Sequence, residues 1–313
     1  MSTSPAFTHS VMFHHFHGGK HLPGQGSLSA DDFDAMIGWL SQRHRILGAD
    51  DYLQRLKSRT LRDADICLSF DDALLCQAEI AVPVLARHGI TAYFFVYSSP
   101  FSGNPDPLEI YRHFRMSQFG DVDAFYTAFF AQAQALYPSE YAQGESGFDV
   151  RTYLSAFPFY TDNDRWFRFL RDRVLMKARY DAIMQAMMDE ARFDVAQASQ
   201  DLWMGNHHLQ KLHQAGHVVG LHSYSHPTMI HQLSPAEQAQ EYARNFEHLQ
   251  ATLGSAPYAM SHPCGNYSDS TLDILKGMGV QIGFRSSLST STIASDLEVP
   301  RNDHANVWKE MTQ

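Results

Sequence analysis

The chain is poor in cysteine, in basic clusters and in long apolar runs, and each shortage argues against a class of protein. The three cysteines, Cys67, Cys76 and Cys264, are odd in number and widely spaced, so we expect no disulfide framework and a reducing compartment. No run of Lys and Arg occurs, and the formal net charge is -10, which argues against nucleic acid and anionic membranes as partners. No apolar run reaches the roughly 20 residues of a membrane-spanning helix.

Residues 1–10 are polar and lack the basic and apolar regions of a signal peptide, so we expect a cytoplasmic protein. A length of 313 residues, 44% of them hydrophobic, suits one large domain or two smaller ones. The 18 histidines are many for this length, and histidine is the commonest metal ligand and acid or base near neutral pH. The oligomeric state stays open.

Short apolar segments alternate with segments of helical periodicity, which is typical of a parallel sheet covered by helices. Residues 45–47 suggest a further short strand. About seven such units would close into a barrel, in which functional residues follow the carboxyl ends of the strands. The main strands are expected at residues 11–13, 66–70, 91–97, 218–221, 258–261, 281–285 and 297–300.

The alternation is interrupted by a helical block at residues 100–201, after the third strand unit and before the fourth. This block is rich in Phe, Tyr, Ala, Gln and Arg and contains no catalytic spacing. We therefore expect an α/β protein in which residues 1–99 and 202–313 form the barrel and 100–201 form a helical insertion or cap. The aromatic residues of the block are expected to form its core rather than to line a substrate cleft.

Two adjacent carboxylates, Asp71 and Asp72, end the buried-type strand at residues 66–70. Like charges side by side are costly unless a positive group compensates them. One interpretation is structural, with Asp72 capping the helix that starts near residue 74. The other is functional, and it gains weight because histidine clusters follow other predicted strands.

One such cluster is His222-Ser223-Tyr224-Ser225-His226-Pro227. Pro227 disfavours α geometry at His226, so we place both histidines on a loop after the strand. Two imidazoles and one carboxylate form the ligand set of catalytic metal sites that keep a position open for water. Zn²⁺ suits this set, although Co²⁺, Ni²⁺, Mn²⁺ and Fe²⁺ would also bind.

Together these motifs resemble the polysaccharide deacetylase family, the chitooligosaccharide deacetylase-like group of carbohydrate esterases with the NodB homology domain. Ser69-Phe70-Asp71-Asp72-Ala73 resembles its first motif and His222-Ser223-Tyr224-Ser225-His226 its second, His-Ser-x-x-His. Ser261-His262-Pro263-Cys264-Gly265-Asn266-Tyr267 resembles the third motif more loosely, and Met12-Phe13-His14 resembles the opening strand of many members.

The resemblance implies a distorted (β/α) barrel and the metal-dependent hydrolysis of an N-acylated amino sugar. By position, Asp72, His222 and His226 would hold one divalent ion, and Asp71 would be the general base. The loop at Pro263-Cys264-Gly265 would contribute a backbone N–H that stabilises the oxyanion. The substrate-binding residues implied by the resemblance, or suggested by their place after a strand, are His14, His262, Pro263, Cys264, Gly265 and Tyr267.

Three positions depart from the family pattern. Ala73 stands where a Gly is usual. His262 stands where many members have an Arg that contacts the base aspartate; a His could still make this contact, but its charge would depend on pH. The final motif, which carries the general-acid histidine, is not clean. His304, in Arg301-Asn302-Asp303-His304, is the expected general acid, with Asp303 or Asp296 orienting it; His14, His15 and His17 are rivals, and an exposed position without function is the alternative.

We expect an enzyme, a hydrolase of carbon–nitrogen bonds other than peptide bonds, that removes an acetyl group or, as the alternative, a formyl group. The expected substrate is an intracellular amino sugar linked to a nucleotide or lipid. One alternative is hydrolysis of a non-sugar amide such as a cyclic ureide. Another is a degenerate deacetylase that only binds sugar, which the altered Arg position and the unclear general acid favour slightly. Intact Asp71, Asp72, His222 and His226 argue against it.

Overall fold

The computed structural model describes residues 9–155, 160–286 and 292–313 and divides the chain into two compact units. The first consists of Met1–Asp106 and Gln200–Gln313, and the second of Pro107–Ser199. From the sequence we placed the corresponding boundaries at residues 99–100 and 201–202. In the described part of the chain, no helix is long and apolar enough to cross a membrane.

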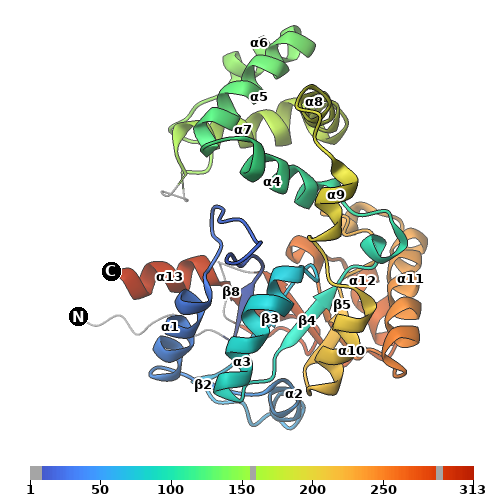
Figure 1. Cartoon of the computed structure of the whole chain (residues 1–313). Coiled ribbons are helices and arrows are strands. Elements are labelled where there is room, and N and C mark those ends of the chain that lie inside the picture. The colour runs from blue at the N-terminus through green and yellow to red at the C-terminus, as the bar shows by residue number, and fades with distance from the viewer. Residues whose placement is uncertain (1–8, 156–159, 287–291) are drawn as a thin grey trace. The chain divides into compact units, whose positions relative to one another are not determined.

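The first unit is a parallel barrel with helices outside it (Figure 1). Seven strands run in the order β1-β8-β7-β6-β5-β4-β3, and pairing of β1 with β3 closes the ring. The short β2 pairs with β3 alone. The expected distorted barrel of about seven strands is thus confirmed. The strands are β1 Ser10–Phe13, β2 Arg45–Ile46, β3 Asp65–Phe70, β4 Tyr93–Val96, β5 Val218–Leu221, β6 Ala259–Ser261, β7 Ile282–Ser286 and β8 Val299–Asp303.

Helices of the first unit begin and end with clear signals. Ser29 and Ser234 each cap a helix through a capping box, which satisfies backbone donors that the first turn leaves open. The segment after Asp72 is helical in two pieces, with a π-helical turn before the α-helix, whose first turn contains Pro83. The helices are α1 Ala30–Ser41, α2 Ala49–Lys57, η1 Gln77–Ala81, α3 Val82–His88, η2 Ser99–Ser102, α10 Asn206–Gln214, η4 Ile230–Gln232, α11 Pro235–Leu253, η5 Pro263–Gly265, α12 Asp269–Gly277 and α13 His304–Thr312.

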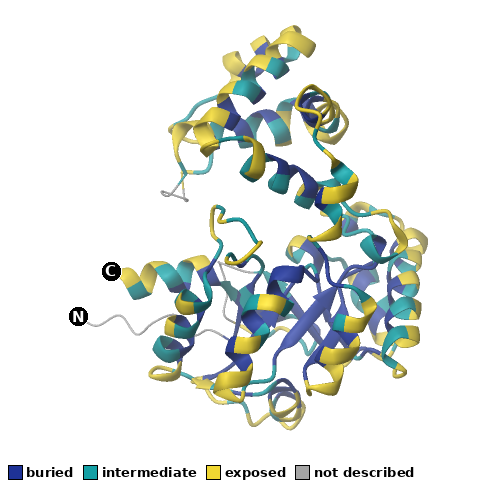
Figure 2. Cartoon of the chain, in the orientation of Figure 1, coloured by how far each residue is buried: buried dark blue, intermediate teal, exposed yellow. Residues whose placement is uncertain are grey.

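One end of the barrel is filled by α2. Its apolar face, with Tyr52 and Leu56, packs against the first inward residues of several strands, including Val218, Ile282 and Val299. Figure 2 shows the strands buried and the outer helix faces exposed. Because all barrel strands are parallel, the opposite end gathers the residues that follow their carboxyl termini.

The second unit is helical and has an aromatic core, which includes the buried Phe114, Phe125, Phe129 and Phe167. Aromatic rings of this unit pack edge to face, as Phe129 and Phe167 do at 4.9 Å between centroids, a favourable arrangement of ring quadrupoles. The aromatic residues therefore form a core, as expected. The helices are α4 Pro107–Gln118, α5 Val122–Leu136, α6 Pro138–Gly147, α7 Asp162–Phe169, η3 Leu170–Leu175, α8 Met176–Glu190 and α9 Val195–Gln200.

His217, just before β5, ties two barrel strands together while it is uncharged. It is 5% exposed, and its Nδ1 accepts a hydrogen bond of 3.1 Å from the backbone N–H of Ala92. Burial lowers the pKa of His217 from 6.5 to about 4. A histidine that stays neutral in the folded state contributes stability above pH 6.5, and this contribution is lost as the pH falls from 6.5 toward 4, because the unfolded chain takes up the proton first.

We therefore expect wild type to lose about 2 kcal/mol more free energy of unfolding than His217→Asn between pH 8 and pH 5. Asn keeps an acceptor near the Nδ1 position but does not titrate. Urea unfolding at both pH values measures the difference. The exposed His213 supplies the control, since His213→Asn should follow wild type. Equal pH dependence of wild type and His217→Asn would contradict the expectation.

Candidate metal centre

Asp71 and Asp72 follow β3 directly, at the carboxyl end of the barrel. The backbone then turns through two left-handed residues, Asp72 with φ of 78° and Ala73 with φ of 53°. Such a conformation costs a non-glycine residue roughly 1–2 kcal/mol. Ala73 is therefore strained at a position where Gly would fit without strain. The side chain of buried Gln77 holds the turn, because its Nε2 donates to the carbonyl oxygens of Asp71 at 2.6 Å and His14 at 2.9 Å.

His222 and His226 lie on the loop after β5, as predicted. The Nδ1–H of His222 donates to the carbonyl oxygen of Ser261 at 2.8 Å. This bond fixes the tautomer and leaves Nε2 as the ligand atom, the usual arrangement around a metal. His226 has φ of 56°, and its ring packs against Tyr97 at 5.5 Å between centroids.

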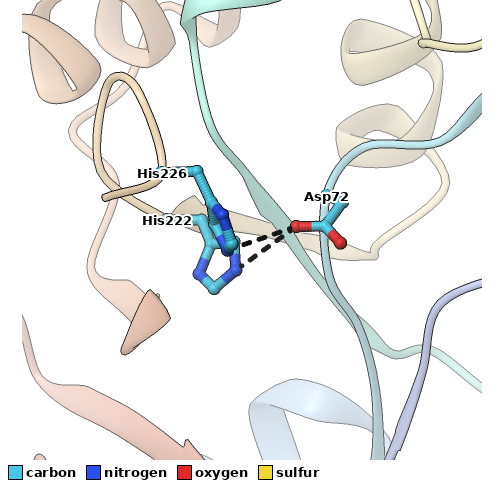
Figure 3. A group of neighbouring side chains, drawn as sticks. All are labelled: Asp72, His222 and His226. Atoms are coloured by element: carbon cyan, nitrogen blue, oxygen red, sulfur yellow. Dashed lines mark ion pairs between the residues drawn. The ribbon is translucent and has the colours of Figure 1, made fainter. Parts of the chain in front are cut away.

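Asp72, His222 and His226 converge from these two segments (Figure 3). The Oδ1 atom of Asp72 lies 3.5 Å from Nε2 of His222 and 3.7 Å from Nε2 of His226. Each residue offers one ligand atom, and the three lie within 4.8 Å of one another. Ligands of a tetrahedral ion with bonds near 2.0–2.1 Å would lie roughly 3.3 Å apart, so small adjustments would suffice.

Asp72 Oδ1 is the feature that best fits a cation. It is buried, and among the described residues it accepts no hydrogen bond. A buried carboxylate oxygen without a partner is costly, and a divalent ion between it and the two imidazoles would remove that cost. The donor set of one carboxylate and two imidazoles is consistent with a divalent metal.

The protonation states follow from burial and from neighbouring charges. Burial disfavours ionised Asp72, but His222 and His226 outweigh it and hold the pKa of Asp72 far below its usual range. Burial lowers the pKa of His226 to about 4 despite the opposing Asp72 charge, so its ring is neutral at pH 7. Burial also opposes charge on His222, but Asp71 and Asp72 raise its pKa.

Asp71 is bound on both oxygens by a residue that the sequence analysis did not assign to the site, Arg301. The guanidinium donates from Nη1 to Oδ1 and from Nη2 to Oδ2, each at 2.7 Å. Ser261 Oγ adds a hydrogen bond of 3.1 Å to Oδ2. Burial opposes ionisation, yet Arg301 and then His222 lower the pKa of Asp71 to about 2.

Arg301 is 2% exposed and lies within β8. We had expected that strand to end at residue 300, which placed Arg301 in a loop. The strand continues to Asp303, and Arg301 is two residues after the inward Val299. This alternation was the signal that could have identified it, because residues i and i+2 of a strand face the same side.

His262 does not contact Asp71, so the suggestion that it could replace the Arg of other members is wrong. Its ring is fully buried, its Nε2 bonds to the carbonyl oxygen of Leu297 at 2.9 Å, and it stacks on Tyr267 at 4.3 Å between centroids. Burial lowers the pKa of His262 to about 4. A neutral, buried ring supports the loop and is not accessible to a substrate.

The other residues of the expected substrate loop differ in how far they are buried. Pro263 is buried, whereas Cys264 is exposed and has φ of 53°. The Gly265 N–H already donates to the carbonyl oxygen of His262 at 2.9 Å, which makes it a poor candidate for the oxyanion donor. Tyr267 is half-buried and donates to Glu298 at 2.8 Å. A substrate-binding role of these four residues stays a prediction.

Two histidines compete for the role of general acid. His304 begins α13; it is 7% exposed, and its Nε2 bonds to the carbonyl oxygen of Gly26 at 2.7 Å. Burial lowers the pKa of His304. His14 follows β1, its side chain is 27% exposed, and its Nε2 lies 4.0 Å from Asp72 Oδ2. The structure thus brings His14, and not His304, next to the metal ligands.

Comparison with known proteins finds a family model that matches part of the chain and solved structures that share its fold. Residues 178–283 match the family model "Polysaccharide deacetylase", a segment that includes His222, His226 and the 262–267 loop. Asp71 and Asp72 lie outside this segment but meet it in the fold. No curated protein matches the sequence.

Solved structures share the architecture over nearly the whole chain. IcaB from Ammonifex degensii is 15% identical, with a TM-score of 0.56 and coverage of 97% of this chain and 94% of that one. The Streptococcus pyogenes deacetylase PplD, solved with acetate, is 14% identical, with a TM-score of 0.53 and coverage of 96% and 93%. A de-N-acetylase from Aggregatibacter actinomycetemcomitans is 12% identical, with a TM-score of 0.54 and coverage of 94% and 93%.

At these identities the solved structures establish the fold, and the family model matches the segment that carries the His222–His226 motif. The chain thus has the fold of these deacetylases, and its residues 178–283 are similar to the polysaccharide deacetylase family.

Proposed function

We propose that this protein hydrolyses the N-acyl group of an amino sugar, with a divalent ion held by Asp72, His222 and His226. The observation that carries the proposal is the unpartnered Asp72 Oδ1, which faces two imidazole Nε2 atoms next to an ionised, immobilised Asp71. Zn²⁺ is the ion we propose. The acyl group is acetyl, with formyl as the smaller alternative, and the proposed sugar is a nucleotide- or lipid-linked precursor in the cytoplasm.

When bound, the ion would lower the pKa of a water molecule and polarise the acyl carbonyl. The chain's own residues do the rest. Asp71 is held ionised by Arg301, and its carboxylate plane is fixed by the two parallel bonds, so that it can accept the proton of the attacking water. The water oxygen becomes bonded to the acyl carbon and the carbon–nitrogen bond breaks. The nitrogen must gain a proton to leave as the amine.

The position of His14 suits delivery of that proton better than the position of His304. His14 is partly exposed and next to the ligand Asp72, whereas the Nε2 of His304 bonds to a backbone carbonyl. The assignment of His304 stays a prediction, and the two can be separated by experiment. Arg301 also supplies the cation that His262 lacks, which removes one of the two reasons for reading the chain as a sugar-binding protein without activity.

We expect purified wild type to bind about one divalent ion per chain and His222→Ala to bind none stably, because two of three ligands make an open, weak site. Elemental analysis after gel filtration measures the ratio. His213→Ala, at an exposed position of α10, is the control and should keep the ion. Equal metal content in wild type and His222→Ala would show that the ligand assignment is wrong.

Asp71→Asn is expected to keep the metal and lose turnover by about 10²- to 10⁴-fold, the usual contribution of a general base. Turnover is measured as acetate or formate released from N-acetyl and N-formyl sugar nucleotides, with chitooligosaccharides and a cyclic ureide in the same panel. Activity on no sugar by the metal-loaded wild type would refute the proposed substrate class.

Asp71→Asn also leaves the Arg301 charge buried without a partner, which can cost about 3–5 kcal/mol. The double variant Asp71→Asn/Arg301→Gln removes both charges and guards against a failure to fold. It should also bind metal and lack turnover. Near wild-type turnover in either folded variant would exclude Asp71 as the base.

Replacement of His14 by Asn should lower kcat by at least 10²-fold, the lower range for general-acid catalysis, while His304→Asn should lower it less. With a substrate that has a 4-nitrophenyl leaving group, which needs little protonation, the decrease of kcat in His14→Asn should be smaller. Metal content is measured alongside, because His14 lies beside Asp72. The reverse order of the two variants would restore His304 as the general acid.

A further inference from the structure

Helix α11 binds the loop that joins the two metal-site histidines. The carboxylate of Glu241 accepts three hydrogen bonds from it: from the Tyr224 N–H at 3.0 Å, the Ser225 N–H at 2.8 Å and the Ser225 hydroxyl at 2.9 Å. The neighbouring Arg244 places its guanidinium 3.3 Å from the centre of the Tyr224 ring. One side chain thus satisfies two consecutive backbone donors in the middle of the His222–His226 loop.

The loop needs such support because its conformation is strained. Ser223 and His226 both have positive φ values, 64° and 56°, and each costs roughly 1–2 kcal/mol for a non-glycine residue. One bond within the loop, from the His226 N–H to Ser223 Oγ at 3.1 Å, opposes relaxation. The other hydrogen bonds to the loop come from outside it, and Glu241 is the side chain that makes the largest number of them.

The two histidines depend on this support to different degrees. His222 is fixed independently, because its N–H donates to Asn245 Oδ1 at 2.9 Å and its Nδ1–H donates to Ser261. Asn245 in turn donates to the Val96 carbonyl oxygen and to Ser98 Oγ. The ring of His226 is placed by the backbone of the loop and by packing against the Tyr97 and His222 rings.

We propose that Glu241 is a positioning residue for the metal centre and acts through His226. It holds residues 224 and 225 so that the strained backbone at residue 226 directs the imidazole toward Asp72. The inference rests on the proposed function only in that the three ligands bind an ion. It requires hydrogen-bond acceptance by Glu241 rather than its charge alone.

The test is a Co²⁺ titration of the metal-free full chain, followed by the visible absorption of the bound ion. Glu241→Ala should raise the Kd for Co²⁺ by about 10- to 100-fold, the usual effect of removing a partner behind a metal ligand, and should alter the Co²⁺ spectrum. Glu247→Ala, at an exposed position of the same helix, should match wild type in both.

Glu241→Gln separates hydrogen bonding from charge. Its carbonyl oxygen can accept both backbone N–H groups, and its amide can donate to Ser225 Oγ. We expect its Kd to lie within about threefold of wild type. A Glu241→Gln protein as weak as Glu241→Ala would overturn the hydrogen-bonding role.

A double-mutant cycle shows whether the effect passes through His226. The titration extends to high Co²⁺ concentrations, at which the weak sites left by removal of one histidine still bind the ion. Glu241→Ala should then weaken Co²⁺ binding much less in a His226→Ala background, where the residue to be positioned is absent, and should keep its full effect in a His222→Ala background. An equal loss of Co²⁺ affinity on Glu241→Ala in all backgrounds would indicate general destabilisation and overturn the proposal. Wild type that binds no Co²⁺ would refute the metal centre itself, whereas wild-type affinity in Glu241→Ala would refute only the role of Glu241.

Discussion

Two neighbouring carboxylates at the end of one buried strand create an electrostatic problem on which the rest of the site depends. Asp71 and Asp72 are both removed from water, and neither can stay ionised there without compensation. The chain solves the problem separately for each. Asp71 receives a permanent cation from β8, through two bonds to Arg301. Asp72 receives two imidazoles from the loop after β5, and together the three side chains could hold a cation.

Because Asp71 and Asp72 have different partners, the two adjacent carboxylates have different chemical properties. A carboxylate held by Arg stays ionised and fixed in orientation, and both of its oxygens are already bonded. Asp72, which faces two imidazoles, keeps an oxygen without a hydrogen bond among the described residues, and this oxygen could hold a cation. Barrel closure makes both possible, because the β1–β3 pairing brings β8 and β5 around the same end of the ring. The geometry explains why the sequence can place Asp71 and Asp72 side by side.

The sequence predicted those parts of the site that are local motifs. The aspartate pair and the His222/His226 loop were recognisable because each lies in one short segment after a strand, and so was the barrel, because its strands and helices alternate. Arg301 was missed because its partner is far away in the chain and because we expected the strand to end at residue 300. β8 in fact continues to Asp303. Pairing with β7 up to Ser286–Arg301 and with β1 at Asn302 and Asp303 is a tertiary effect that no local pattern reveals.

The error at His262 has the same origin and a chemical consequence. The sequence suggested a histidine in place of an arginine, and therefore a contact to the base that would depend on pH. The structure instead buries a neutral His262 against Tyr267 and supplies the cation from another strand. Because a guanidinium stays protonated throughout the physiological range, the compensation of Asp71 is constant with pH. The charge that polarises this site is thus set by a residue outside the recognisable motifs, and motif inspection alone would have judged the chain more degenerate than it is.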